Sequence, residues 1–412
     1  MKMKLTTFVT AALLLSSPLP ARADIVQDWN AIAIAATGTQ NPFNQARIMA
    51  ATQLAVFEAV NTIAPQYQSY LGTLVAPAGA SIDAAVITAA HDVLKSYLPT
   101  NTTIDDLRTS ALSAIPDGPA KASGITVGAA AASAMITARL GDGSAPPEFS
   151  VPASTDPGVW QLTPTCVAGG GLLLHWRNVK LFGIENAADF VSPPPPELSS
   201  NQYAKDLNEV KSVGSKTSTE RPQDRTDVAR FYAGSSPGYV TNLAARQLSA
   251  AQGRSTADNA RAFALINMAI SDAFVAQFTT KYHYNFWRPE TAIHGADLDD
   301  NDKTESDLAW EPLIPAPCFP GYGSNHAAGS YAGGEVLRRL YGADGHSITM
   351  ANPNIPGLVF QYSELKQITA DVDDARVYGG IHFRFDQEAG ARIGREVATA
   401  VVRENLRRVH QD

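Results

Sequence analysis

Cysteines, alternating β-branched residues and long apolar runs are scarce in this chain, and each scarcity excludes something. Only two cysteines, Cys166 and Cys318, occur among 412 residues, and they do not form a metal-binding pattern. In an exported protein they could form one disulfide, although nothing in the sequence places them close together. The rarity of β-branched alternation argues against an extended sheet. Beyond residue 25 no apolar run is long enough to cross a bilayer, so we expect no stable membrane anchor.

Residues 1–23 resemble a secretory signal peptide. Two lysines near the start, a short apolar stretch and the tripeptide Ala21-Arg22-Ala23 match the three parts of such a segment. The alternative, a membrane anchor, would need a longer apolar run. We therefore expect cleavage near Ala23 and a periplasmic or secreted protein.

Basic residues are outnumbered in this chain. There are 32 Lys and Arg residues against 40 Asp and Glu residues, which gives a formal net charge of −8. Removing residues 1–23 takes away two lysines and one arginine, so that 29 basic residues remain and the net charge becomes −11. Such an acidic chain is a poor binder of nucleic acid or anionic lipid. Any anion site in it must be a local basic pocket.

The remaining sequence predicts an all-α fold with a large helical domain. At 45% hydrophobic residues, the chain can bury a large core. Long stretches rich in Ala, Leu, Met and Val are separated by Pro and Gly. We expect an N-terminal helical half over residues 24–142 and a C-terminal helical domain, carrying the site, over residues 201–412. The clearest predicted helices cover residues 45–61, 82–97, 103–114, 120–140, 202–213, 256–280, 327–341 and 382–407.

The segment between these halves, residues 143–200, is rich in Pro and Gly and predicts a long irregular connection. It contains a run of three glycines and ends near four consecutive prolines, Pro193 to Pro196. Two roles are open for it. It could cover a pocket entrance, or it could be an irregular crossover on the surface, which is the simpler interpretation.

Lysine and arginine residues in the first of three short segments, residues 281–289, are candidates for binding an anion. Lys281 and Arg288 are seven residues apart, about two helical turns, so both can point the same way. Pro289 favours a bend at Arg288. Arginine offers a planar fork to two anion oxygens, while lysine offers a compact charge. Aromatic neighbours, including Trp287, would shield the pocket; alone, such a pair is more typical of a solvated helix face.

The second segment, residues 322–326, ends at a predicted helix start. Ser324 is a favoured N-cap residue, which is its structural interpretation. The same geometry presents free backbone N–H groups of residues such as Asn325 and the positive end of a helix dipole to an anion. His326, in the first turn, can donate a proton to an anion oxygen or accept one. Phe319 precedes this segment, and we expect its ring to pack above the anion site.

The third segment, residues 376–386, supplies Arg376 and His382. Glycines between them allow the backbone to approach a ligand. Asp386, four residues after His382, could hydrogen-bond the imidazole and fix its tautomer. Alternatively, Asp386 pairs with Arg384 or caps the helix.

Taken together, the three segments resemble the vanadium-dependent haloperoxidases and the wider type 2 phosphatidic acid phosphatase superfamily. The pattern of that family is Lys, six residues, Arg-Pro; then Ser-Gly-His; then Arg, five residues, His, three residues, Asp. Residues 286–289 and 381–386 resemble the haloperoxidase branch in their aromatic residues. The resemblance extends over about residues 255–404 and is looser over residues 47–61.

The resemblance implies a role for each candidate residue. It implies that His382 is the single protein ligand of vanadium, that His326 is the acid–base group, and that vanadate is the cofactor. It further implies hydrogen peroxide, a halide and a small organic acceptor as reaction partners, and hypohalous acid as the product. The remaining residues would neutralise or hydrogen-bond the vanadate oxygens: Lys281, Arg288, Ser324, Asn325 and Arg376.

Asn325 departs from the family pattern, which has Gly at this position, and Gly323 replaces the usual Pro. Glycine permits a closer approach of the backbone to the anion than asparagine does. Two other functions therefore stay open. One is an acid phosphatase in which His382 forms a phosphohistidine and His326 protonates the leaving group. The other is an oxyanion-binding protein without activity.

Two acidic features have simpler interpretations. Asp272, nine residues before Lys281, either orients one of the cationic groups or lies on a helix surface. The acidic stretch of residues 297–307 resembles a calcium loop, but Asp302 stands where Gly is required and Leu308 where Glu is required. We expect a solvated loop there. We expect the histidines that the family pattern does not include to be surface or structural residues. Among them, His283 and His294 flank the first segment and are the most suited to line a channel.

Overall fold

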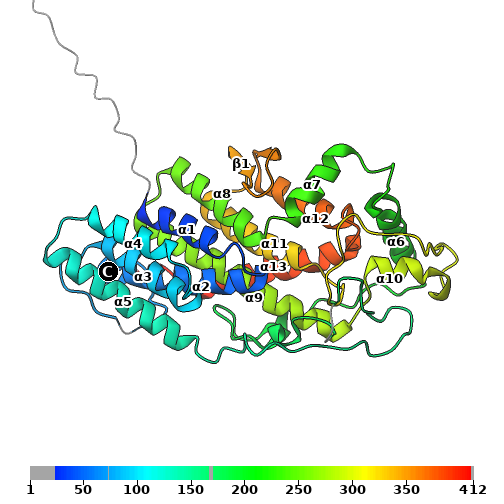
Figure 1. The fold of residues 1–412 in the computed structure, drawn as a ribbon, viewed down its shortest axis with the longest axis horizontal. Coiled ribbons are helices and arrows are strands. Elements are labelled where there is room, and N and C mark those ends of the chain that lie inside the picture. The colour runs from blue at the N-terminus through cyan, green and yellow to red at the C-terminus, as the bar shows by residue number, and fades with distance from the viewer. Residues whose placement is uncertain (1–23, 73, 167–169, 410–412) are drawn as a thin grey trace, which may run out of the picture.

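A computed structural model describes residues 24–72, 74–166 and 170–409, and it confirms the all-α fold (Figure 1). The predicted signal peptide, residues 1–23, lies outside the described residues. Apart from one two-stranded hairpin, β1 (Ile348–Ala351) and β2 (Val359–Tyr362), the described elements are helices. The α-helices are α1 (Ile25–Ala36), α2 (Pro42–Ile63), α3 (Ile82–Tyr97), α4 (Thr103–Ser113), α5 (Pro119–Ala138), α6 (Asn201–Gly214), α7 (Gln223–Ala233), α8 (Pro237–Gln252), α9 (Thr256–Tyr284), α10 (Pro289–His294), α11 (Asn325–Tyr341), α12 (Leu365–Val377) and α13 (Arg384–Glu404).

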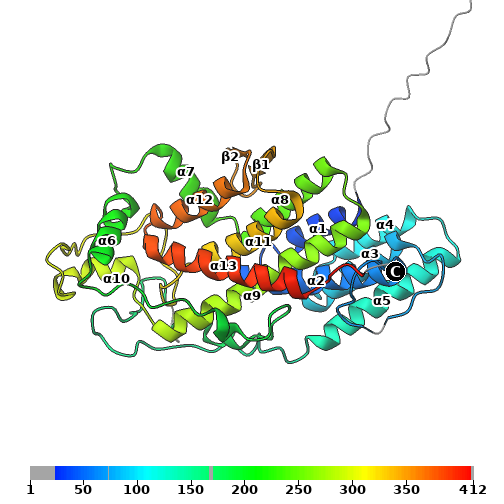
Figure 2. The ribbon, with the colours of Figure 1, turned by 180° about the vertical axis from the view of Figure 1, so that it is seen from behind.

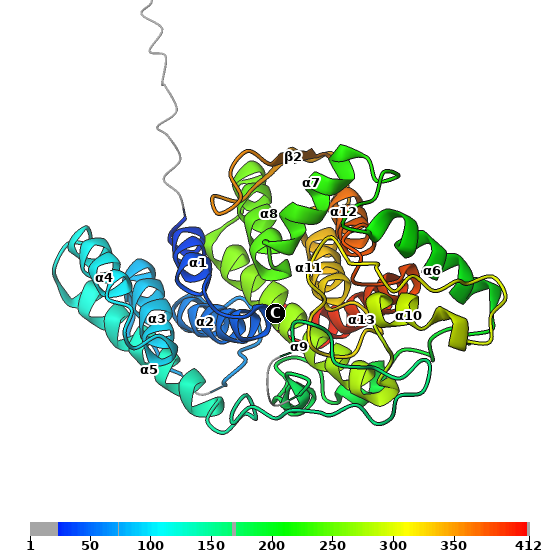
Figure 3. The same ribbon diagram turned by 45° about the vertical axis from the view of Figure 1, so that its right-hand side comes forward.

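The long helix α9 forms the centre of the protein. Its start is fixed by Ser255, whose side chain accepts a hydrogen bond from the backbone N–H of Asp258. Its end is fixed by Asn285, which has a left-handed backbone conformation with φ of 48°. Between these residues nearly every side chain is buried, because α2, α8, α11 and α13 pack around the helix. Figure 2 shows α13 beside α9 and α11, and Figure 3 shows the same group turned by 45° from Figure 1.

Five of the other helices lie at the two ends of an elongated molecule. Helices α3, α4 and α5 lie at one end, while α6 and α10 lie at the opposite end (Figures 1 and 2). One hydrophobic core contains residues of both predicted halves, for example Val60, Ala89 and Phe274. The division of the chain into two helical halves therefore stays a prediction.

Helix α9 also corrects one expectation about apolar runs. Among the described residues, Thr256–Tyr284 alone is long and apolar enough to cross a membrane. However, 94% of its most apolar window is buried inside the protein. A helix surrounded by other helices can be apolar on every side, so this composition is typical of a core helix.

The connection over residues 143–200 is irregular and in large part exposed, as predicted for a surface crossover, and the central helix anchors it. Asp272 of α9 accepts hydrogen bonds from the backbone N–H groups of Phe182, Gly183 and Ile184, at 2.8, 2.6 and 3.1 Å. Both roles proposed for Asp272 from the sequence are therefore wrong. Its carboxylate is fully buried, and it anchors the connection to the central helix.

Further contacts bind this connection to the segments that carry the candidate residues. The backbone N–H of Trp160 donates to the carbonyl of Asn285 at 2.8 Å, and that of Trp287 donates to Gly158 at 2.9 Å. Cys166 and Cys318 form a disulfide, which answers the question that the sequence left open. The connection thus supports the loops around the site from outside.

Candidate functional site

The three short segments converge at one end of α9, α11 and α13, although the first does so for a different reason than predicted. Lys281 belongs to the last turn of α9, whereas Arg288 is the N-cap residue of α10. The left-handed backbone of Asn285 breaks the helix between them. Their convergence therefore comes from a reversal of the chain and not from helical spacing.

Backbone carbonyls of one irregular loop hold both cations. The ammonium of Lys281 donates to the carbonyl oxygens of Pro320, Gly321 and Gly323, at 2.9, 2.8 and 2.5 Å. Arg288 donates through Nε to the carbonyl of Phe319 at 2.9 Å. These bonds use all three N–H groups of Lys281, so the lysine supplies mainly charge to the site.

The Phe319 side chain lies against the same two cations, as expected from the sequence. The centre of its ring is 5.4 Å from Nζ of Lys281 and 4.9 Å from the guanidinium carbon of Arg288. A ring face carries partial negative charge and attracts cations. Phe319 therefore keeps water away from the cations and compensates part of their charge.

The second segment forms the N-terminus of α11. The hydroxyl oxygen of Ser324 accepts a hydrogen bond from the backbone N–H of Ala327 at 3.2 Å, so the predicted N-cap is confirmed. Asn325 is the first residue of the helix, and both polar atoms of its buried carboxamide are without a hydrogen-bond partner. His326 is half-buried and faces a cavity. This end of the helix presents unpaired donors to any anion near it.

Arg376 approaches from the last turn of α12, a helix that the sequence did not predict. Its side chain is buried, and its Nε and one terminal nitrogen, Nη1, have no hydrogen-bond partner. A buried unpaired donor is costly, and a charged one more so. Arg376 is therefore the cation of this site with free donors for a ligand.

His382 precedes α13 and is held by Asp386. Nδ1 of the imidazole lies 2.8 Å from a carboxylate oxygen of Asp386, which also accepts a hydrogen bond from the backbone N–H of Phe383 at 3.1 Å. Asp386 thus both orients the imidazole and caps the helix. Nε2 of His382 lies 3.2 Å from Nη1 of Arg288. If Nδ1 donates to Asp386, Nε2 carries the lone pair and accepts from Arg288.

Charge is unbalanced in this buried site. None of Lys281, Arg288 and Arg376 forms an ion pair with a carboxylate among the described residues. Burial lowers the pKa of Arg288 to about 9 and that of Arg376 to about 10. Burial, followed by the charge of Arg288, also lowers the pKa of Lys281 well below its ordinary value. Each shift reflects the cost of holding an uncompensated cation away from water.

The pKa values of both imidazoles of the site are lowered for the same reason. Burial is the main cause that lowers the pKa of His326, followed by the charge of Arg376. Burial also lowers the pKa of His382, followed by the charges of Arg288 and Lys281. A neutral imidazole keeps a lone pair for a Lewis acid or a proton.

A tetrahedral oxyanion fits these residues. It would neutralise the cations and would find donors at Arg376, at the carboxamide of Asn325 and at the N-terminus of α11. Nε2 of His382 is the nitrogen available to hold the central atom of a metal oxyanion, because Nδ1 is occupied by Asp386. The structure therefore brings together all seven residues predicted from the sequence: Lys281, Arg288, Ser324, Asn325, His326, Arg376 and His382.

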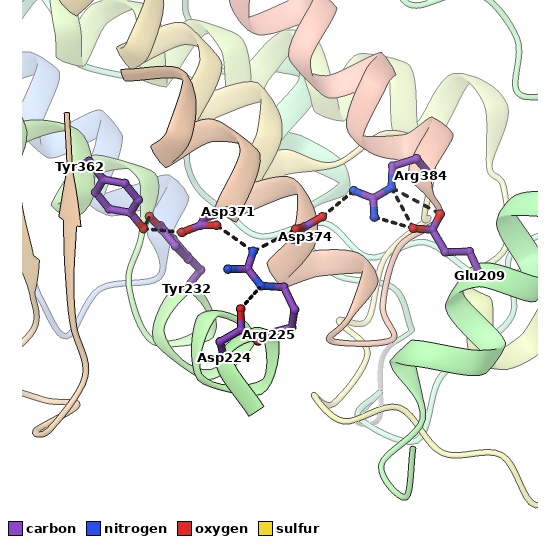
Figure 4. Close-up of polar contacts among 8 residues, drawn as sticks. All are labelled: Glu209, Asp224, Arg225, Tyr232, Tyr362, Asp371, Asp374 and Arg384. Carbon is purple, nitrogen blue, oxygen red and sulfur yellow. Dashed lines mark hydrogen bonds and ion pairs between the residues drawn. The ribbon is translucent and has the colours of Figure 1, made fainter. Parts of the chain in front are cut away.

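A chain of polar contacts braces the helices that carry Arg376 and His382 (Figure 4). Arg384 of α13 donates to Glu209 of α6 at 2.6 Å and to Asp374 of α12 at 3.0 Å. Arg225 of α7 donates to Asp374 at 3.0 Å and to Asp371 at 2.8 Å. Asp374 and Arg384 are each two residues from a site residue, so this network fixes α12 relative to α13.

The cavity in front of His326 could not be found from the sequence. It has a volume of ≈ 500 Å³, and its other lining residues include Gln45 of α2 and Arg246 of α8.

Two other histidines near the first segment lie elsewhere. His283 is exposed, and His294 hydrogen-bonds the carbonyl of Trp310 at 2.8 Å. Neither of these two lines the cavity, and both are surface or structural histidines, as expected.

The acidic stretch of residues 297–307 is held together by its own contacts. Asp297 accepts hydrogen bonds from the backbone and side chain of Ser306, and Asp299 accepts one from Thr304. Among the described residues, no group of three or more His, Cys, Asp or Glu side chains could hold a metal ion.

Comparison with known proteins agrees with this site. The family model for the VCPO second helical-bundle domain matches residues 261–411, which contain all three segments. The vanadium chloroperoxidase of Curvularia inaequalis is 35% identical over 95 residues, which are 21% of this chain and 15% of that protein. Over residues 261–411 this chain is therefore similar to the vanadium-dependent haloperoxidases.

Solved haloperoxidase structures share the fold. The crystal structure of the first bacterial vanadium-dependent iodoperoxidase covers 96% of this chain, and this chain covers all of it, with a TM-score of 0.81 and 26% identity. A bacterial vanadium-dependent chloroperoxidase in its holo form covers 88% of this chain, with 92% of its own length aligned, a TM-score of 0.70 and 17% identity. At that identity the second likeness shows the fold alone, so the reaction must be argued from the site.

Proposed function

We propose that this protein is a vanadate-dependent haloperoxidase that uses hydrogen peroxide to oxidise a halide to hypohalous acid. The observation that carries the proposal is the group of three buried cations without a carboxylate partner, beside a histidine whose Nε2 is free of its own carboxylate. The cations require an anion, and the histidine offers that anion one ligand. The similarity to haloperoxidases makes vanadate the anion that best satisfies both.

Vanadate, when bound, supplies a Lewis acid that activates hydrogen peroxide toward a halide ion. Around it, Lys281 and Arg288 supply positive charge while backbone carbonyls keep them in place. To expose Nε2 of His382, Arg288 has to release its 3.2 Å contact with that nitrogen. Asp386 keeps the imidazole oriented during this exchange.

His326 is the residue best placed to move protons. It faces the cavity through which small molecules can approach, and its imidazole is neutral. Neutral His326 can accept a proton from an incoming peroxide and return it to a leaving oxygen. The apolar and aromatic residues around the site exclude water, which strengthens each electrostatic interaction within it.

Two assays on the same preparation test this proposal. Vanadate is added to metal-free protein, and bromide-dependent halogenation with peroxide is measured beside hydrolysis of a phosphomonoester. Halogenation that appears only with vanadate supports the proposal. Phosphatase turnover that vanadate inhibits would instead indicate a phosphohistidine enzyme, and inactivity in both assays would indicate an oxyanion-binding protein.

The His382→Ala variant gives a test that is independent of turnover. Loss of Nε2 removes the only protein ligand proposed for vanadium, so we expect the dissociation constant of vanadate to rise by a factor of about 100 or more. Isothermal titration calorimetry on the metal-free protein measures this. The exposed His283 lies outside the site, and His283→Ala should bind vanadate as the wild type does. Equal affinity in both variants would exclude His382 as the ligand.

We also propose that the protein acts after export, in the periplasm or outside the cell. The support is the signal-like sequence of residues 1–23 together with the disulfide between Cys166 and Cys318. Structural disulfides persist in oxidising compartments. Cell fractionation with an antibody, and mass spectrometry of the mature N-terminus, test the proposal; an intact N-terminus in the cytoplasmic fraction would contradict it.

A further inference from the structure

The cavity in front of His326 has an unusual chemical character for so acidic a protein. None of its described lining residues is Asp or Glu. Its lining combines apolar residues, among them Ile34 and Pro42, with polar residues such as Ser236 and Asn352. Its volume of ≈ 500 Å³ lies in the range of small-molecule sites and far exceeds the space that one halide ion needs.

Arg246 of α8 is the single fixed cation among these lining residues. One terminal nitrogen of its guanidinium donates to the side-chain oxygen of Asn30 at 2.6 Å. Among the described residues, no carboxylate lies within ion-pair distance of this guanidinium, and burial lowers its pKa. Arginine keeps its charge in proteins, so the cavity contains a positive charge without a partner.

Buried amides behind Arg246 hold it in place. The side chain of Asn30 donates to Asn242 of α8 at 2.7 Å, and Asn242 donates to Asn267 of α9 at 2.9 Å. All three asparagines are fully buried. The guanidinium is therefore fixed at one nitrogen, and its other donors are available to a ligand in the cavity.

From these observations we propose that the cavity binds the organic acceptor of the reaction, and that Arg246 selects acceptors that carry a carboxylate. This inference rests on the proposed function, because His326 is a residue of the oxyanion site that also lines the cavity. A guanidinium matches a carboxylate with two parallel hydrogen bonds, which a neutral amide cannot reproduce. The apolar residues of the lining are suited to the ring of an aromatic acid.

Two probes of the same size test the selection. These are 4-hydroxybenzoate and 4-hydroxybenzamide, titrated into vanadate-loaded protein so that the oxyanion site is already filled. We expect the wild type to bind the acid more tightly than the amide. In Arg246→Gln the dissociation constant of the acid should rise about tenfold or more, whereas that of the amide should change little. The Michaelis constants for bromination of the two compounds should follow the same order.

Two further variants test whether the preference for the acid depends on the guanidinium of Arg246 or on the loss of any arginine. Arg246→Lys keeps the charge but not the planar fork, so it should retain only part of the preference for the acid. It also carries the test if Arg246→Gln does not fold. Arg230→Gln removes an exposed arginine of α7 that does not line the cavity, and it should behave as the wild type.

Several outcomes would overturn the inference. One is a wild type without preference between the acid and the amide. Another is an Arg246→Gln variant that weakens both probes equally, or that raises the Michaelis constant of bromide alone. If the wild type binds the acid selectively but does not oxidise halide, the proposed function fails while the selective site stands. The two failures can therefore be told apart.

Discussion

At the scale of single residues, Asn325 is the most informative member of the oxyanion site. Its carboxamide is buried at the N-terminus of α11 and has no hydrogen-bond partner among the described residues. Leaving two polar atoms unpaired costs free energy unless a ligand pairs them. Asn325 therefore has a function that the glycine of the family pattern cannot have: its amide group can donate a hydrogen bond to an anion.

Replacing this carboxamide by a carboxylate should have two opposite effects. In Asn325→Asp, the new charge lies near three unpaired cations and at a helix N-terminus, so the vanadate-free protein should melt at a higher temperature. The same charge repels an oxyanion, so the dissociation constant of vanadate should rise by at least about tenfold. Thermal denaturation and calorimetric titration measure the two effects, and Asn325→Ala is the uncharged control. An unchanged vanadate affinity in Asn325→Asp would mean that the side chain faces away from the bound anion.

The identity of the site residues could be predicted from the sequence, but their contacts could not. The types and spacings of Lys281, Ser324 and His382 were sufficient because cations, an N-cap and imidazoles are what an oxyanion requires. The loop carbonyls that bind Lys281 have no sequence signal, since every residue carries a carbonyl. Arg246 was missed because an arginine within a helix is normally on a solvated face.

At the scale of elements, the central helix α9 has two roles. Its C-terminal end belongs to the site, and the connection over residues 143–200 is attached farther along the same helix. Asp272 is the point of attachment for the connection, through three backbone N–H groups. Burial raises the pKa of this carboxyl to about 6, while the three hydrogen bonds lower it. The carboxyl group is kept in the core because the three backbone N–H groups that it accepts from need a hydrogen-bond partner there.

Two consequences follow for the Asp272→Asn variant. An amide offers one acceptor oxygen to three N–H groups and brings its own donors against them, so the variant should lose on the order of 1–3 kcal/mol of stability. The folded-state pKa of about 6 is above the usual 3.8, so the wild type loses stability as the pH rises from about 4 to about 6. The variant has no carboxyl to ionise. Its deficit in melting temperature should therefore be smaller at pH 7 than at pH 4.

Melting curves of the wild type and of Asp272→Asn at pH 4 and pH 7 measure this deficit. A deficit that grows with pH would mean that the folded state favours the ionised carboxylate, contrary to the direction of its pKa. A deficit of zero at both values would mean that water replaces the side chain as acceptor for the backbone of residues 182–184.

Most of the long helices with an apolar pattern were predicted, whereas α7 and α12 were missed, as were α1 and α8, which carry few charges. Helices α3 and α11 begin and end close to the predicted residues, because apolar stripes, an N-cap serine and Gly342 mark them. Helices α7 and α12 have many charged residues, and they are stabilised by packing and by the polar network of Figure 4. Such long-range contacts are not visible in a local window of sequence.

At the scale of the whole molecule, the oxyanion site depends on segments that are far apart in the chain. The disulfide joins Cys166 of the connection to Cys318, and the two cysteines are separated by 152 residues. The loop that follows Cys318 supplies the carbonyl acceptors of Lys281 and Arg288. The cross-link therefore restrains the unfolded chain and also fixes the loop that holds two cations of the site.

Replacing both cysteines by serine should lower stability and vanadate affinity together. A cross-link over so long a stretch typically contributes about 2–4 kcal/mol, chiefly by restricting the unfolded state. We expect the melting temperature to fall, and the dissociation constant of vanadate to rise severalfold, because the carbonyls that hold Lys281 become less fixed. Reduction of the wild-type protein should reproduce both effects, which controls for the new hydroxyl groups. If the variant melts at a lower temperature but binds vanadate with wild-type affinity, the hydrogen bond from Leu172 to the carbonyl of Cys318, at 2.8 Å, is sufficient to hold the loop.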